Sequence, residues 1–148
     1  VGVLVSPCAD ATLLNKLQAE IEKEGARMEV VAPKVGGVEA ADGSWIEGRH
    51  MIDGGPSVLF DAVALILSEE GAERLTGEAA ARDFVADAFA HCKFIGFTSG
   101  AVPLFRKAGV DPEADEGLID LHEPKAISEF IGSCRKLRLW SREMAVKL

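Results

Sequence analysis

The fold is decided at the start of the chain, in residues 1–32, which read VGVLVSPCADATLLNKLQAEIEKEGARMEVVA. Val1–Val5 is short, apolar and rich in β-branched residues, which is typical of a buried parallel strand. Apolar side chains then recur at helical spacing over Ala11–Glu24, directly after Asp10 as a capping residue. Met28–Ala32 reads as a second strand. Two strands joined by one helix form a βαβ unit, so the two strands are predicted to run parallel.

The same alternation of strands and helices continues through most of the chain. The predicted elements are strands at Ala62–Leu67, Phe94–Phe97 and Leu118–Leu121, and helices at Glu78–His91, Val102–Ala108 and Ile127–Leu137. Residues 68–77 fit either a short helix or an exposed loop. The turn Asp42-Gly43-Ser44 lies between two short β-like runs and predicts a small accessory β-hairpin. The pattern predicts an α/β fold: a doubly wound, mainly parallel sheet of five strands with helices on both faces, in a single domain of residues 1–148.

Composition narrows the function classes. The 148 residues are 48% hydrophobic, which is enough to build a core, and the net charge of −8 argues against nucleic acid as a partner. The longest strongly apolar run, Ala62–Leu67, is far shorter than the roughly 20 residues that span a bilayer, so no membrane partner is expected. Cys8, Cys92 and Cys134 form neither a disulfide framework nor a metal-binding pair, which indicates a reducing, cytoplasmic setting.

Candidate chemistry gathers where the predicted strands end. Ligands bind at the carboxyl ends of the strands in such sheets, and there Thr98 and Ser99 form an abrupt strand-to-helix turn that resembles a nucleophile elbow. His122, which follows the last strand, is the candidate base. Asp10 and Cys8, in the first strand–helix loop, are weaker candidates. The competing interpretation is an ordinary turn capped by hydroxyl groups, and the sequence favours it.

Cofactor sites find little support in the sequence. No glycine-rich phosphate motif follows the first strand, and the loop Ser6–Asp10 offers a proline and an acid where a flavin phosphate would need small donor residues. No two histidines have metal-ligand spacing, and the chain contains no tyrosine, so neither a metal nor a haem is expected in it. A flavin or nucleotide binder is kept as the second alternative.

Three long stretches carry a resemblance to a known family. They are VVAPKVGGV (residues 30–38), MIDGGPSVLFDAV (51–63) and AARDFVADAFAH (80–91), and LWSRE (139–143) fits as well. Together they resemble the C-terminal domain of large-subunit haem catalases of the hydroperoxidase II type. The resemblance covers nearly the whole chain.

This resemblance implies a flavodoxin-like fold, related to PfpI-type peptidases and class I glutamine amidotransferase-like proteins. The parent enzyme would be a homotetramer that dismutates hydrogen peroxide at haem in a separate N-terminal β-barrel domain. This chain would hold no haem and no catalytic residue. It would contact the barrel domain and other subunits, stabilise the tetramer, and act on unfolded client proteins in a chaperone-like way. Val1 opens directly on a strand without an initiator methionine, so the chain is expected to be a fragment of a longer one.

The resemblance also bears on the elbow. The wider superfamily places a cysteine where Thr98 or Ser99 stands here, and its helper acid has only Asp10 as a nearby counterpart. Without the thiol, peptidase-type chemistry is not expected. The first alternative is therefore a stand-alone PfpI-type hydrolase, or an amidotransferase-like enzyme, with a serine or threonine in place of the elbow cysteine.

Overall fold

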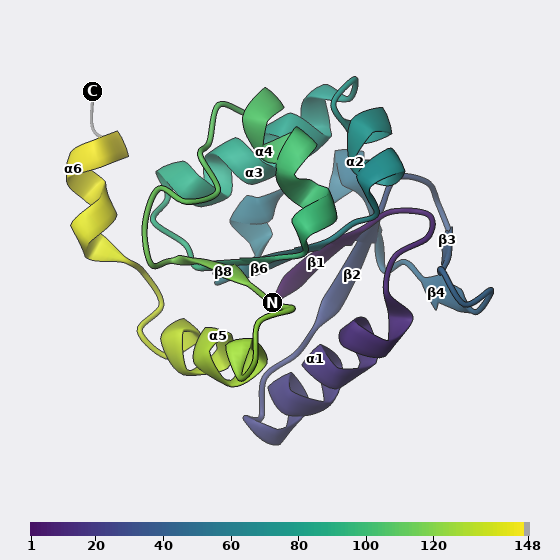
Figure 1. Cartoon of the computed structure of the whole chain (residues 1–148), viewed down its shortest axis with the longest axis horizontal. Helices are drawn as coiled ribbons and strands as arrows, with labels where there is room; N and C mark the ends of the chain where they lie inside the picture. The colour runs from purple at the N-terminus through teal and green to yellow at the C-terminus, as the bar shows by residue number, and fades with distance from the viewer. Residues whose placement is uncertain (147–148) are drawn as a thin grey trace.

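The computed structural model describes residues 1–146, and a six-stranded sheet lies at its centre (Figure 1). All five neighbouring strand pairs of this sheet run parallel. In spatial order the strands are β5 (His50–Met51), β2 (Glu29–Ala32), β1 (Gly2–Val5), β6 (Val63–Ile66), β7 (Ile95–Phe97) and β8 (Leu118–Asp120). The predicted hairpin is confirmed: β3 (Gly37–Glu39) pairs antiparallel with β4 (Trp45–Glu47) outside the main sheet.

The prediction of five strands is wrong, because β5 adds a sixth at one edge of the sheet. Val31 pairs with His50 and Ala32 with Met51, and the amide of Arg49 also donates to the carbonyl of Val30 at 2.8 Å. A strand of two residues carries no hydrophobic period that a sequence could reveal. Its pairing with β2 is fixed by the path of the intervening hairpin, not by its own residues.

Helices cover both faces of the sheet, so the molecule has three layers (Figure 1). One face is covered by α1 (Ala11–Lys23) and α5 (Ala126–Cys134). The other is covered by α2 (Glu69–Leu75), α3 (Ala79–Ala90) and α4 (Val102–Lys107). The segment that the sequence left open is therefore a helix, and Ser68 caps it by accepting a 3.0 Å hydrogen bond from the amide of Gly71. Short 3-10 turns at Ile52–Gly54, Ser57–Leu59, Ser99–Ala101 and Trp140–Arg142 connect these elements, and α6 (Glu143–Val146) follows the last turn.

Alternate side chains of the central strands pack into two separate halves of the core, one on each face of the sheet. In β1, Leu4 packs under α2, α3 and α4, whereas Val3 and Val5 pack under α1 and α5. This alternation follows from the two-residue period of a strand. Burial of each such side chain contributes roughly 1.5–3 kcal/mol, and both faces of the sheet are thereby fixed.

The segment after α5 is fastened to the body by a buried arginine. Arg142 is 2% exposed, and its guanidinium donates to both carboxylate oxygens of Asp115 at 2.6 and 2.8 Å. It also donates to the carbonyl of Lys93 at 2.7 Å and lies 4.4 Å from the ring centroid of Phe89. Burial raises the pKa of Asp115, but the hydrogen bonds from Arg142 and from the amide of Gly117 outweigh burial and hold the pKa below its ordinary value. The segment from α5 to Arg142 is therefore part of the folded body.

None of the helices among residues 1–146 is both long and apolar enough to cross a membrane.

Candidate functional site

A cleft at the carboxyl ends of the strands gathers all five candidate residues. Cys8, Asp10, Thr98, Ser99 and His122 line one open hollow of about 520 Å³. The hollow lies beside the point where the strand order reverses between β1 and β6, which is where doubly wound sheets bind ligands. Its position agrees with the prediction from the sequence.

Thr98 does not point a free hydroxyl into the cleft. Its side chain is buried, and Oγ1 donates to the carbonyl of Leu67 at 2.9 Å and accepts from the amide of Leu67 at 3.1 Å. The backbone of Thr98 is extended, with φ −97° and ψ 153°, so it lacks the strained conformation of a nucleophile elbow. Thr98 therefore ties β7 to the end of β6, and its hydroxyl is unavailable as a nucleophile.

Ser99 is exposed and begins the turn that leads into α4. Among residues 1–146, no hydrogen bond joins its hydroxyl to His122 or to another base. The next residue fixes the turn: a Cβ on Gly100 would stand 2.4 Å from the carbonyl oxygen of Leu67. The turn is thus packed directly against the β6–α2 loop, and only a glycine fits at that position.

The histidine at the cleft faces an acid instead of a hydroxyl. His122 Nε2 lies 3.5 Å from Asp10 Oδ2, and both side chains are about half exposed. The other carboxylate oxygen of Asp10 accepts from the amide of Leu13 at 2.9 Å, which confirms Asp10 as the cap of α1. A catalytic triad consists of a nucleophile, a histidine and a carboxylate that orients the histidine. The histidine and the carboxylate are present here, but no nucleophile among the described residues is hydrogen-bonded to His122.

The first strand–helix loop, Ser6–Asp10, has few free backbone N–H groups that could bind a phosphate. Cys8 is exposed with φ +62°, and its amide donates to the carbonyl of Glu39 at 2.9 Å. The amide of Ala9 donates to the carbonyl of Ser6 at 3.1 Å, and Pro7 has no amide hydrogen. Phosphate-binding loops need several free backbone donors. The geometry therefore disfavours a flavin or nucleotide at this loop.

Two serines close the crevice between β1 and β6. The amide of Ser68 donates to Ser6 Oγ at 3.0 Å, and Ser68 Oγ donates to the carbonyl of Pro7 at 2.8 Å. Ser6 is fully buried, and a Cβ on Gly71 would collide with its side chain at 2.2 Å. These hydrogen bonds join the β1–α1 loop to the β6–α2 loop across the switch point.

Sequence reasoning missed the charged rim of the cleft. Glu69 and Glu73 of α2 and Arg106 of α4 also line it. The sequence predicts the helix that carries Arg106, and it fits either a helix or a loop for the segment that carries Glu69 and Glu73. Nothing in the local pattern indicates that these side chains face the same hollow as Thr98. Long-range packing of α2 against α4 brings them there.

Metal-binding chemistry is not visible in the described part of the chain. Within residues 1–146, no group of three or more His, Cys, Asp or Glu side chains is placed to hold a metal ion. His50 Nε2 donates to Glu29 Oε2 at 2.6 Å, and this hydrogen bond lowers the pKa of Glu29. His91, at the end of α3, is exposed.

The family model that describes the C-terminal domain found in long catalases matches residues 1–144. Catalase C of Rhizobium meliloti (strain 1021) is 51% identical over 147 residues, which cover 99% of this chain and 21% of that protein. Catalase HPII of Pseudomonas putida is 26% identical over 147 residues, covering 99% of this chain and 20% of the relative. The chain thus spans about a fifth of the length of these relatives.

Solved structures confirm the expected fold. Oxidized DJ-1 of Toxoplasma gondii superposes with a TM-score of 0.67 at 15% identity, covering 99% of this chain and 95% of that one. A ThiJ/PfpI domain protein from Brachyspira murdochii reaches a TM-score of 0.63 at 15% identity, over 72% of this chain and 61% of that one. At such identities the likeness concerns the fold alone.

Proposed function

The chain belongs to the family of C-terminal domains found in long catalases, and on that premise we propose that it is a non-catalytic domain of such an enzyme. The parent reaction would be the dismutation of hydrogen peroxide to water and oxygen, at a haem in a separate N-terminal β-barrel domain. Residues 1–148 would form one flavodoxin-like domain of the parent. Its role would be to stabilise the homotetramer and to bind unfolded clients.

The observation that carries this proposal is the state of Thr98. Covalent hydrolysis at an elbow needs a nucleophile with a base in reach. Here the Thr98 hydroxyl is buried in two hydrogen bonds to Leu67, and His122 contacts Asp10 instead of Ser99. The cleft keeps the shape of an active site but holds no assembled nucleophile and base.

The residues of this chain do not fit a haem of their own. A haem iron takes a His, Cys, Met or Tyr ligand within an apolar cavity. The chain has no tyrosine, and His50 and His122 both face carboxylates. An apolar pocket beside Val1 and Cys134 holds about 230 Å³, less than the roughly 300–1,000 Å³ of ordinary ligand pockets. We therefore propose that no step of the parent reaction runs through this chain.

The stabilising role is tested by removing the domain from a long catalase that carries it. If residues 1–148 stabilise the tetramer, the truncated enzyme keeps its peroxide-dismutating rate at low temperature but dissociates at a lower temperature. Light scattering during a thermal ramp follows the dissociation. A truncated tetramer that dissociates at the wild-type temperature would contradict the role.

The chaperone-like role is supported by apolar side chains at the surface. Val35, Val58, Leu59 and Met144 are between 58% and 86% exposed. Exposed apolar groups hold unfolded chains, and the net charge of −8 would keep such complexes in solution. The test is heat-induced aggregation of a client enzyme at equimolar domain, with an equally acidic, unrelated protein as control. Equal turbidity in both samples would reject this role.

A cytoplasmic location for the parent enzyme is supported by its thiols. Cys8, Cys92 and Cys134 are all free in the structure, and unpaired cysteines are usual where glutathione keeps thiols reduced.

A hydrolase of the PfpI type is the second candidate, and the contact between His122 and Asp10 is the observation in its favour. Ser99 or Cys8, which line the same cleft, would supply the nucleophile. An esterase or peptidase screen of the purified chain tests it. Activity that disappears in Ser99→Ala or Cys8→Ala would establish this candidate, and activity unaffected by both substitutions would remove it.

A further inference from the structure

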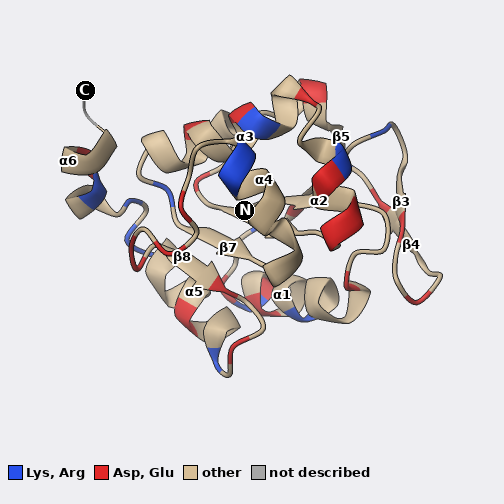
Figure 2. Cartoon of the chain, turned by 45° about the horizontal axis from the view of Figure 1, so that its top comes forward, with Lys and Arg blue, Asp and Glu red and all other residues tan. Residues whose placement is uncertain are grey.

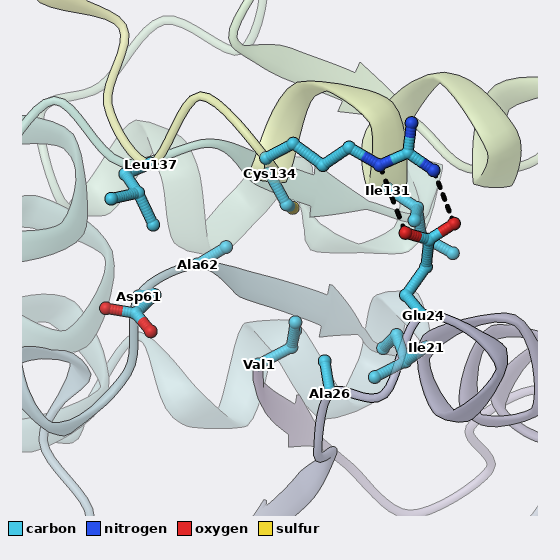
Figure 3. Close-up of a pocket in the computed structure, with 10 residues that line it drawn as sticks. Val1, Ile21, Glu24, Ala26, Asp61, Ala62, Ile131, Cys134 and Leu137 are labelled. Carbon is cyan, nitrogen blue, oxygen red and sulfur yellow. Dashed lines mark hydrogen bonds and ion pairs between the residues drawn. The ribbon is translucent and has the colours of Figure 1, made fainter.

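A second hollow lies at the opposite end of the sheet from the cleft, where the strands begin. This amino-end pocket, defined by Val1, Ile21, Ala62, Ile131 and Leu137, has a volume of about 230 Å³ (Figure 3). Val1 and Ala62 directly precede β1 and β6, and Ile21 and Ile131 come from α1 and α5. The pocket thus joins the edge of the sheet to the helical layer on one face.

The pocket has an apolar floor and a charged rim. On the rim, Arg135 Nε donates to one carboxylate oxygen of Glu24 at 3.0 Å, and a second guanidinium nitrogen donates to the other oxygen (Figure 3). Cys134 also lines the pocket, and burial raises the pKa of its thiol to about 12, so it stays protonated and behaves as a small apolar group. Such a lining fits an apolar side chain framed by polar contacts.

Leu137 is the residue at this pocket that folding alone does not explain. Its φ is +65°, in the left-handed region where helices usually end on glycine or asparagine, and its side chain is 55% exposed. A leucine in a disfavoured backbone conformation, with half its surface in water, points to a contact outside the domain.

The tail that contains Leu137 combines bound arginines with exposed apolar side chains. Its three arginines contact the body: Arg135 binds Glu24, Arg138 donates to the carbonyl of Asp61 at 3.0 Å, and Arg142 binds Asp115. Leu139 packs against the core, but Trp140 is 67% exposed and Met144 86%. Figure 2 shows the basic residues gathered between α5 and α6. Surfaces of soluble proteins usually have the opposite arrangement.

Membership of the family implies that a long polypeptide precedes this domain. The chain is a C-terminal domain and spans about a fifth of its relatives. In a long catalase, the polypeptide that precedes the domain joins it at Val1, and Val1 itself lines the pocket. A preceding segment is thus tethered within a few residues of the pocket, which gives it a high effective concentration there.

We propose that the amino-end pocket and Leu137 form the docking surface for the part of the long-catalase polypeptide that precedes this domain, with an apolar side chain of that part seated in the pocket. The proposal rests on the proposed function and adds to it the face through which the domain is held.

The test uses an intact long catalase that carries this domain, with Leu137→Asn as the variant. Asparagine tolerates the left-handed conformation, so the domain still folds while the apolar contact is lost. The readout is the rate of limited proteolysis of the polypeptide just before Val1. We expect a rise of roughly tenfold, the effect of losing one buried leucine contact on the docking equilibrium. Val35→Asn, at an 84% exposed position beside the hairpin, is the matched control, and we expect the wild-type rate from it.

Two further results keep the docking proposal separate from the stabilising role. Leu137→Met keeps an apolar side chain at this position, and we expect the protease to cleave this variant at the wild-type rate. If cleavage rises in Leu137→Asn although removal of the domain leaves tetramer dissociation unchanged, docking stands and the stabilising role fails. Wild-type cleavage in Leu137→Asn would overturn docking. A second result would also overturn docking. If the isolated chain formed a stable dimer that Leu137→Asn dissolved, while the intact enzyme was unaffected, the face would belong to a second copy of the domain.

Discussion

At the scale of single residues, the use of a hydroxyl depends on which way it points. Thr98 and Ser99 are neighbours with the same functional group, yet the side chain of Thr98 is buried against the end of β6 and that of Ser99 is exposed. A buried hydroxyl that satisfies both the amide and the carbonyl of Leu67 contributes to stability and is costly to remove. Thr98 is therefore a structural residue at the carboxyl end of the sheet.

Thr98→Val tests this assignment, because valine keeps the shape of threonine but leaves the amide and carbonyl of Leu67 without their partner. We expect the free energy of unfolding to fall by about 1–3 kcal/mol. Ser99→Ala is the control and should change it by less than about 0.5 kcal/mol. Urea denaturation measures both. Equal stability of the two variants would show that the Thr98 hydroxyl is not structural.

The ion pair between Asp115 and Arg142 makes the stability of the protein depend on pH. The pKa of the Asp115 carboxyl is lower in the folded protein than the ordinary 3.8. A lowered pKa contributes stability that is fully present above about pH 3.8 and is lost as the pH falls through the folded value. Asp115→Asn should therefore lose less stability than the wild type between roughly pH 5 and pH 2. The readout is the free energy of unfolding across this range. Asp115→Asn with the same pH dependence as the wild type would contradict this role of the carboxyl.

At the scale of elements, the β3–β4 hairpin depends on two glycines with different constraints. Gly37 and Gly43 both have positive φ, of +125° and +84°. A Cβ at Gly37 would stand 2.0 Å from the carbonyl oxygen of Ile46, whereas nothing lies within 4 Å of one at Gly43. The first glycine is needed for space and conformation, and the second for conformation alone.

Gly43→Ala should cost about 1 kcal/mol of unfolding free energy through backbone strain, and Gly37→Ala should cost about 1–3 kcal/mol more through the added collision. Denaturant titration of both variants gives the difference. If the two variants were equally stable, the close approach of Gly37 to β4 would be wrong.

Elements with strong local patterns could be predicted from the sequence, and those fixed by distant contacts could not. The turn Asp42-Gly43-Ser44 predicted the hairpin, because Asp42 Oδ1 accepts from the amide of Ser44 within the turn itself. β5 was missed because its two residues have no pattern of their own. In the site, parallel strands brought Asp10, Ser99 and His122 to one edge as predicted. That His122 would face Asp10 depends on side-chain directions that spacing does not contain.

At the scale of the whole molecule, two ends of one sheet have different characters. The carboxyl end holds the open cleft, whose crevice Ser6 and Ser68 fill with hydrogen bonds. The amino end holds an apolar pocket beside Leu137 and the start of the chain. Doubly wound sheets bind ligands at the carboxyl end, whereas the proposed docking surface of this domain lies at the opposite end.

The exposure of Trp45 and Trp140, at 63% and 67%, has an optical consequence. The chain has no other tryptophan and no tyrosine, so all of its strong intrinsic fluorescence comes from indoles already in contact with water. Unfolding should hardly shift the emission maximum, although circular dichroism records the loss of helices. In Trp45→Phe the light would come from Trp140 alone. The emission of this variant would report the environment of the tail alone, in a protein whose unfolding hardly shifts its emission.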